Sequence, residues 1–186
     1  MSNIRIFVSH RIDIDSETVD TPVYFPVRCG AVYDEEGNSE IQGDDTGDNI
    51  SKLRMSFCEF TVQYWAWKNV DADYYGLCHY RRYLSFSDKR YKNTAFNMVR
   101  ELRLTAHEKK KYHLDDTKKI NIVVQKYDMI IPELAKASEM SYNRAEVKTL
   151  REMWESYNGV YFEQGIIDKM FSLIKEYSPE YYNSAC

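Results

Sequence analysis

The sequence predicts an α/β protein, because short β-rich runs alternate with a helical stripe along the chain. Residues 4–8 and 74–78 are short apolar runs of the kind that form buried strands. Between them, apolar residues recur three and four positions apart, which is the period of an α-helix. The length of 186 residues, without internal repeats or low-complexity segments, predicts a single domain over residues 1–186.

The first predicted strand, residues 4–8, ends in the polar sequence Ser-His-Arg at 9–11. In open α/β sheets, ligands bind outside the carboxyl ends of the strands, so this strand carries polar groups at the end where ligands bind. Pro22 and Pro26 then bracket a region that we expect to be extended and irregular. Residues 34–38 are rich in turn formers and predict a hairpin or a surface loop.

Residues 43–49, Gly-Asp-Asp-Thr-Gly-Asp-Asn, predict a tight loop that leads into a helix. Asp48 or Asn49 is the expected N-cap. Asp44 and Asp45 are the acidic candidates for a site, because they could bind sugar hydroxyls, act as a general base or ligate a cation. The alternative is that they are turn and capping carboxylates.

The helix that follows is defined by an apolar stripe. The stripe predicts one helix whose aromatic rings pack into the core, and it consists of Ile50, Leu53, Phe57, Phe60, Tyr64 and Trp67. Asp71 and Asp73 follow it. Two carboxylates at this spacing can hold a divalent cation, but they precede the next strand and so favour a polar connector at its amino end.

The strand at 74–78 ends in His79-Tyr80-Arg81-Arg82-Tyr83, which is the most informative stretch of the chain. Arginine presents a planar fork of donors that suits phosphate, so Arg81 and Arg82 predict an anionic ligand. The alternative is a strand end tied to neighbouring carboxylates. If the two strands are parallel neighbours, His10 and His79 open onto the same crevice.

The rest of the chain gives weaker signals. Residues 84–120 predict a loop followed by polar helical segments, and residues 127–131 a third strand that Pro132 stops. From residue 145 the pattern is helical again, with an interruption at Ser178-Pro179. The sequence motifs of dinucleotide-binding proteins, P-loop enzymes, serine hydrolases and zincins do not occur in it.

Composition excludes several classes of protein. The net charge of -4 argues against a general nucleic-acid binder, so no nucleic-acid partner is expected. Lysines nevertheless crowd residues 109–126; they predict a solvated face, or else docking on an anionic membrane surface. The four cysteines form no CxxC pair, which predicts neither a zinc site nor a disulfide framework. Without a signal-peptide pattern or a membrane span, a cytoplasmic protein is expected.

Three segments together resemble a known family: residues 6–10, residues 43–51, and residues 64–69 running into 75–83. They are similar to a bacterial domain of unknown function found in capsular and exopolysaccharide synthesis proteins. The resemblance covers residues 4–83 firmly and extends loosely to about residue 182. It implies a glycosyltransferase of the GT-A type, with a Rossmann-like sheet and flanking helices. It also implies that further chain normally follows, so we expect this domain to be incomplete at its C-terminus.

The resemblance also assigns residues. It places Val8, Ser9 and His10 near the nucleotide base of a UDP-sugar, with galactose as the sugar. His79, Arg81 and Arg82 take the place where many GT-A enzymes carry an Asp-x-Asp metal motif. Because no acid stands there, no metal ligand is assigned, although a divalent cation (Mn²⁺ or Mg²⁺) remains a candidate cofactor.

The sequence thus yields one main hypothesis and one rival. The main hypothesis is glycosyl transfer from a UDP-sugar to a glycan or lipid-linked glycan acceptor, in the cytoplasm or at the inner face of the membrane. Asp44, Asp45 and His79 are the catalytic candidates, and Arg81 and Arg82 would stabilise the diphosphate. Two further residues of the acidic loop, Thr46 and Asn49, are candidates for donor binding. The rival is a non-catalytic module that binds a nucleotide or a glycan.

Overall fold

The computed structural model describes residues 2–14, 16–35, 40–91, 103–132, 149–156 and 165–185. The chain divides into two compact units, Met1–Glu133 and Leu134–Cys186, and each is described by itself. The prediction of a single domain over residues 1–186 therefore stays a prediction. No helix among the described residues is both long and apolar enough to span a bilayer.

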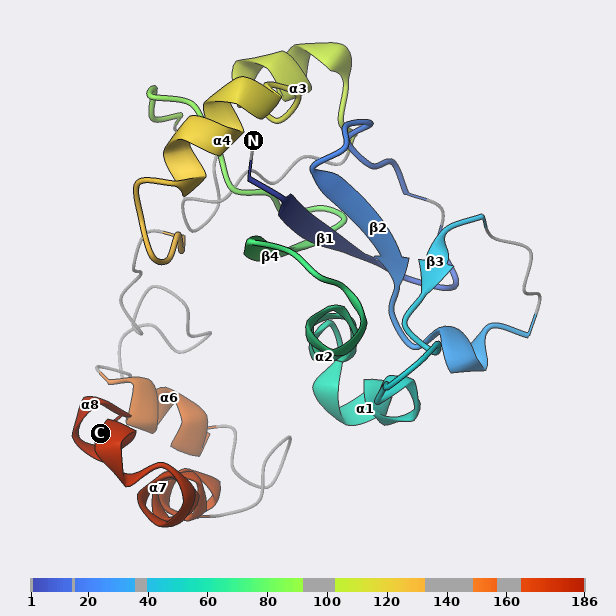
Figure 1. The fold of residues 1–186 in the computed structure, drawn as a ribbon. Coiled ribbons are helices and arrows are strands. Elements are labelled where there is room, and N and C mark those ends of the chain that lie inside the picture. Colours follow the sequence, from blue (N-terminus) through green and yellow to red (C-terminus); the bar gives the residue numbers. More distant parts are fainter. Residues whose placement is uncertain are drawn as a thin grey trace. The chain divides into compact units, whose positions relative to one another are not determined.

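The first unit is built on a four-stranded parallel sheet (Figure 1). The order of its strands is β3-β2-β1-β4. They are β1 (Ile4–His10), β2 (Tyr24–Arg28), β3 (Gln42–Gly43) and β4 (Tyr74–His79). Both strands predicted from apolar runs are confirmed, and each extends to include the histidine that follows the run. Strands β1 and β4 are parallel neighbours, which is the condition under which His10 and His79 were expected to share a crevice.

Strand β2 lies in the region that was expected to be irregular, and that prediction was wrong. Pro26 sits inside the strand, although proline removes a donor from the ladder. Cys29 donates its N–H to His10 on β1, whereas the Arg28 carbonyl accepts from Asp44 on the opposite side. By this alternation the nitrogen of Pro26 faces the β3 side. There β3 pairs only from Val27 onward, so the missing donor costs no ladder bond.

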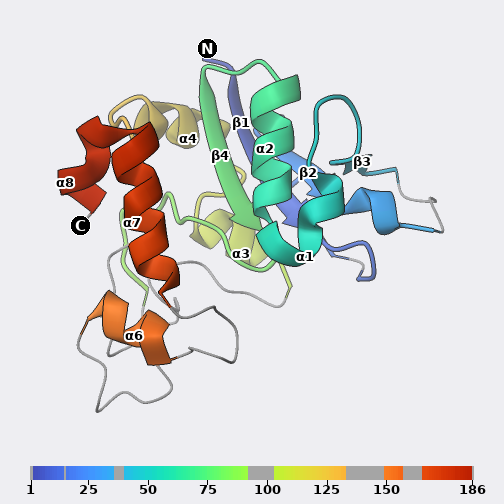
Figure 2. The same cartoon turned by 90° about the horizontal axis from the view of Figure 1, so that it is seen from below.

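Helices cover both faces of the sheet. Helix α2 (Phe60–Asn69) lies against one face, while α3 (Ala106–Lys111) and α4 (Thr117–Val124) lie on the other (Figures 1 and 2). Side chains of β1 alternate between these layers. Phe7 packs with Val62 and Trp65 on the α2 side, and Val8 packs with Leu114 and Ile120 on the other. This three-layer arrangement confirms the predicted α/β class.

The predicted helix over residues 50–67 is broken into pieces. A 3-10 turn, η2 (Ser51–Leu53), leads into the single turn α1 (Arg54–Phe57), and α2 starts only at Phe60. The break is at Cys58, whose φ of 46° is left-handed. Neither Asp48 nor Asn49 is an N-cap; Asn49 Oδ1 instead accepts the Ser51 N–H at 3.2 Å in a local turn.

The apolar stripe does not pack into the core as expected. Helix α2 buries its opposite side, through Thr61, Val62, Trp65 and Ala66. The helix is apolar on both sides, so periodicity alone could not identify the side that faces the sheet. Most of the stripe is therefore exposed to solvent.

Elsewhere the sequence predictions had mixed outcomes. Residues 127–131 form no strand, but the polar helices expected after the loop are present as α3 and α4, capped by Thr105 and Asp116. The segment Ala31–Tyr33 is a 3-10 turn, η1. The described residues of the second unit, 149–156 and 165–185, form mainly helices, with a break after Tyr177 as predicted at Ser178-Pro179. They are α6 (Leu150–Ser156), α7 (Ile166–Tyr177), η3 (Pro179–Tyr181) and α8 (Tyr182–Ala185).

Candidate functional site

The two parallel strands β1 and β4 each end in a histidine that is followed by arginine within the next two residues, at the carboxyl edge of the sheet. Ser9 of β1 is in register with His79 of β4. Beyond the strand ends, Arg11, Arg81 and Arg82 all lie close enough to His79 to act on its pKa. In open α/β sheets this edge is where ligands bind. The structure therefore brings His79 and several arginines together at a position suited to an anion, whereas His10, one residue out of register with His79, is buried on the opposite face of the sheet, so the two rings do not open onto one crevice as expected.

His10 is buried and makes hydrogen bonds through both ring nitrogens. Its Nδ1 lies 2.5 Å from Ser16 Oγ, and its Nε2 lies 2.6 Å from Thr18 Oγ1. Burial, reinforced by nearby His79, lowers the pKa of His10 to about 4, so the ring is neutral at pH 7. This histidine ties the loop after β1 to the strand end.

His79 is only partly exposed and is held in a defined tautomer. Its Nδ1 accepts the Arg81 backbone N–H at 3.2 Å, so the neutral ring carries its proton on Nε2. That Nε2 faces Glu59 Oε1 at 3.5 Å. Burial lowers the pKa of His79 below its usual value; Glu59 opposes this effect, and Arg82, Arg81 and Arg11 add to it.

We call Arg11, His79, Arg81 and Arg82 the cationic corner. Both Arg81 and Arg82 are exposed, and no carboxylate among the described residues is paired with either. The Arg81 guanidinium lies 4.9 Å from the centre of the Tyr80 ring, which orients it. Arg11 is also exposed, but Asp13 holds it in a two-pronged ion pair.

Asp44 is a structural residue, which corrects its assignment as a catalytic candidate. Its carboxylate has no exposed surface and accepts four hydrogen bonds. Two come from backbone N–H groups, Gly30 and Ala31, both at 2.9 Å. The other two come from hydroxyls, Ser51 at 2.6 Å and Thr61 at 2.5 Å. No lone pair is left for a substrate, so Asp44 fastens the acidic loop to η1 and α2.

The exposed part of the acidic loop is well ordered by its neighbours. Thr46 Oγ1 accepts from Trp65 Nε1 at 3.0 Å, and Asn49 Nδ2 donates to the carbonyls of Asp45 and Gly47. The Asp45 side chain is exposed. Asp45, Thr46 and Asn49 remain candidates for contacting a ligand.

The acidic loop and the cationic corner share an edge of the sheet but not a pocket. The loop follows β3 and the corner follows β4, and these strands lie at opposite margins of the sheet. Three strand spacings separate them, which is about 14 Å. Val8, Ser9 and His10 lie beneath this edge and are buried, so direct side-chain contact with a nucleotide base, as the resemblance implied, is not available in this conformation.

The described residues contain no cluster of three or more His, Cys, Asp or Glu side chains placed to hold a metal ion. The pair Asp71 and Asp73 lies at the amino end of β4, as predicted for a connector. Asp73 Oδ2 accepts the Asn3 backbone N–H at 2.7 Å, and the Asp71 carbonyl accepts from the Asn3 side chain. The three cysteines that the structure describes are all free thiols.

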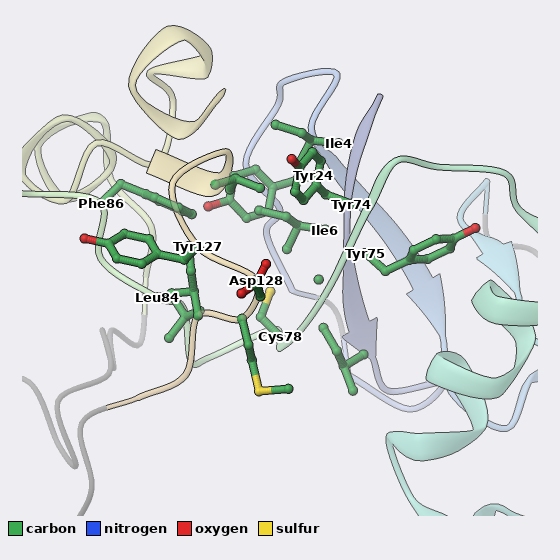
Figure 3. Close-up of a pocket in the computed structure, with 15 residues that line it drawn as sticks. Ile4, Ile6, Tyr24, Tyr74, Tyr75, Cys78, Leu84, Phe86, Tyr127 and Asp128 are labelled. Carbon is green, nitrogen blue, oxygen red and sulfur yellow. The ribbon is translucent and has the colours of Figure 1, made fainter. Parts of the chain in front are cut away.

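A cavity of about 290 Å³ lies on the other side of β4 from α2 (Figure 3). Its walls come from β1, β2, β4 and the segment around Tyr127, whereas Tyr75 points away from it toward α2. The lining is mostly apolar, with Asp128 as its one acidic residue. The cationic corner contributes no residue to this cavity, so the two features are separate.

Sequence reasoning missed two residues of the edge, Arg11 and Glu59. Arg11 could have been found, because Ser-His-Arg after the first run parallels Cys-His-Tyr-Arg after the second. Glu59 gave no such signal. It reaches His79 only because the break at Cys58 turns the start of α2 toward the end of β4.

A parallel sheet covered by helices on both faces, with clustered cations at its carboxyl edge, defines an α/β protein of the doubly wound, Rossmann-like class with an edge suited to an anionic ligand. The chain belongs to the family described as "Domain of unknown function (DUF4422)", whose sequence profile matches residues 5–186. This finding supports the resemblance, without confirming the capsular role.

Among solved structures, the apo form of WbbM, a bifunctional glycosyltransferase, is similar to 96% of this chain. The TM-score is 0.80 and the sequence identity is 27%. The chain spans 30% of the length of that structure. No curated protein sequence matches the chain significantly. The GT-A-like fold is thereby shown, and the chain is glycosyltransferase-like.

Proposed function

We propose that this chain transfers a sugar from a UDP-sugar donor to a bacterial surface glycan, with the cationic corner as the site of the donor diphosphate. The observation that carries the proposal is the exposure of Arg81 and Arg82 at the carboxyl edge, with no carboxylate partner among the described residues. The family and the likeness to a bifunctional glycosyltransferase favour the same class of reaction.

In this mechanism the arginines neutralise charge on the leaving diphosphate. Sugar transfer breaks the bond between the anomeric carbon and the terminal phosphate oxygen, and negative charge develops on that oxygen. Fixed guanidiniums stabilise such charge without reorganising. Arg81 and Arg82 would contact the phosphates directly, and Arg11 would join them after exchanging Asp13 for phosphate oxygens.

The remaining candidates act on the sugar side. Asp45, exposed at the end of β3, would accept hydrogen bonds from sugar or acceptor hydroxyls, helped by Thr46 and Asn49. His79 is neutral with its proton on Nε2, so it would donate a hydrogen bond rather than serve as a base from that nitrogen. A divalent cation remains a candidate, but the described residues offer no assembled metal site, and no step is routed through one.

The proposal includes the identity of both substrates. The donor is a UDP-sugar with galactose as the sugar, and the acceptor is a capsular, exopolysaccharide or lipid-linked glycan. Isothermal titration calorimetry with UDP and UDP-galactose tests the donor site. We expect Arg81→Ala and Arg82→Ala each to weaken UDP binding about tenfold, because a charge-assisted hydrogen bond contributes on the order of 1.5–3 kcal/mol. Lys118→Ala removes an exposed cation elsewhere and should leave UDP affinity unchanged. Equal affinity in all four proteins would contradict the site.

A second candidate, a module that binds a nucleotide sugar without turnover, is favoured by the burial of Asp44. That burial removes one of the two carboxylates first considered as bases. A donor-hydrolysis assay separates the two functions. UDP binding together with release of UDP from UDP-galactose supports a transferase, whereas binding without any release, with or without Mn²⁺, supports the module.

A further inference from the structure

Five large apolar side chains of the segment from η2 to α2 are exposed to solvent. We call them the apolar ridge. Their exposed fractions are Leu53 47%, Met55 87%, Phe57 47%, Phe60 62% and Trp67 65%. Isolated exposed apolar residues are ordinary, but five within fifteen positions on adjoining helices mark an interaction surface. A helix that is apolar on both sides is normally covered on both.

The charges beside the ridge indicate what covers it. Residues 50–69 contain three basic side chains, Lys52, Arg54 and Lys68, and a single acid, Glu59, and Asp48 adds a second acid beside them by accepting from the Tyr64 hydroxyl at 3.1 Å. Glu59 faces His79 of the cationic corner. This segment is therefore positively charged in a chain whose net charge is -4. A cationic and apolar ridge complements an anionic lipid surface.

The chemistry of the ridge also matches a membrane interface. Trp67 and Tyr64 pack edge to face at 5.8 Å, and Lys68 Nζ lies 3.7 Å from the centre of a Trp67 ring. Aromatic rings beside a lysine are typical of the level of the lipid headgroups. Met55, the most exposed member, is on the single turn α1, two residues from Leu53 and two from Phe57.

A second copy of the chain is a poorer match. The five side chains of the ridge each have on the order of 200 Å² of surface and expose about half to nine-tenths of it, so together they offer on the order of 600 Å². A stable protein interface needs roughly 800 Å² from each partner. Insertion of a narrow ridge into a lipid surface has no such requirement, because buried apolar area and attraction to anionic headgroups add together.

We propose that the apolar ridge docks the protein on an anionic membrane surface. The turn between α1 and α2 links this surface to the candidate site. The Cys58 carbonyl accepts from Cys29 Sγ just beyond β2, and Glu59 pairs with His79. Docking thus brings the cationic corner to the lipid surface. If the proposed transfer is correct, a lipid-linked acceptor would be found there, and only this consequence rests on the proposed function.

Vesicle flotation without any donor tests the docking. The full chain is mixed with vesicles of phosphatidylcholine alone, or of phosphatidylcholine and phosphatidylglycerol in equal parts. We expect binding to the anionic vesicles only, weakened by salt. The double variant Met55→Ser/Phe57→Ser should bind at least about tenfold less, since burial of such side chains drives the partitioning. The matched variant Ile122→Ser/Met129→Ser removes exposed apolar residues elsewhere and should bind normally.

Other outcomes overturn the proposal. Failure of the wild-type chain to bind anionic vesicles would do so, as would full binding by the ridge variant. Loss of binding in Lys110→Glu/Lys118→Glu, with full binding by the ridge variant, would assign docking to the lysine-rich helices α3 and α4. A wild-type dimer that the ridge variant dissociates, without vesicle binding, would assign the ridge to a second copy. UDP titration of the ridge variant, expected to be normal, keeps this test independent of the donor site.

Discussion

Replacement of Asp44 by asparagine distinguishes a structural carboxylate from a catalytic one. Each oxygen of Asp44 accepts one backbone N–H and one hydroxyl: Ala31 and Ser51 on Oδ1, Gly30 and Thr61 on Oδ2. The amide group of asparagine replaces one of these oxygens with a donor. The hydroxyl on that side can rotate to accept from the amide, but the backbone N–H cannot, and it is left without an acceptor in a buried position.

The expected loss of stability follows from these bonds. An unsatisfied buried donor costs about 1–3 kcal/mol, and hydrogen bonds to a charged acceptor contribute more than those to a neutral one. With the remaining bonds weakened as well, we expect Asp44→Asn to destabilise the protein by about 3–4 kcal/mol. For a chain of this size that lowers the melting temperature by about 10 °C. The neighbouring exposed carboxylate gives the control, because Asp45→Asn should change stability by less than about 0.5 kcal/mol.

Thermal melts followed by circular dichroism, with urea unfolding as a second measurement, provide the test. UDP affinity measured well below the melting temperature should be nearly unchanged in Asp44→Asn. The reasoning would be refuted by a variant that melts with the wild type yet loses turnover, since that pattern belongs to a residue in contact with the reacting atoms.

Three further predictions concern the same unit. Tyr83 has a buried hydroxyl without a hydrogen-bond partner among the described residues, so Tyr83→Phe should stabilise the protein by about 1 kcal/mol in urea unfolding. Thr61→Val removes a bonded hydroxyl and should destabilise the protein. If both variants changed the free energy of unfolding in the same direction, neither assignment would hold. Gly47 has a φ of +57°, and a Cβ there would lie 2.0 Å from Asn69 Oδ1, so Gly47→Ala should lower the free energy of unfolding by about 1–3 kcal/mol. Gly165 has a φ of +76° but open space around it, so Gly165→Ala should lower it by only about 1 kcal/mol. Burial lowers the pKa of His10 from 6.5 to about 4, so the unfolded chain binds more protons between these values and stability falls as the pH falls through them. In His10→Gln the stability lost between pH 6.5 and 4 should be smaller by up to about 2 kcal/mol, and an unchanged pH profile would show that His10 does not titrate in this way.

The local sequence was enough to predict the strands that hold the cationic corner. Residues 4–8 and 74–78 are apolar runs with a sharp polar end, and a parallel pairing places His10 and His79 at one edge. The sequence left open whether Arg81 and Arg82 meet an anionic ligand or neighbouring carboxylates. Their exposure, without a carboxylate partner among the described residues, favours the ligand.

What the sequence could not provide was partners that are distant along the chain. In the sequence, Asp44 cannot be distinguished from a catalytic acid. Only the fold shows that the backbone N–H groups of Gly30 and Ala31 donate to its carboxylate. The inner side of α2 is decided by the sheet, because both sides of the helix are apolar. Strand β2 was missed because Pro26 normally argues against a strand, and only the short β3 makes it tolerable there.

The misreadings of Asp44 and of the inner side of α2 have one physical origin, and it connects the site to the ridge. The carboxylate of Asp44 anchors Ser51 and Thr61, which flank the break at Cys58. That anchor fixes which side of α2 packs on the sheet, and so it also fixes which apolar residues stay outside. The same break turns Glu59 toward His79. Unfolding of this anchor should therefore release the cationic corner and the apolar ridge together, whereas substitutions in either one should leave the other intact.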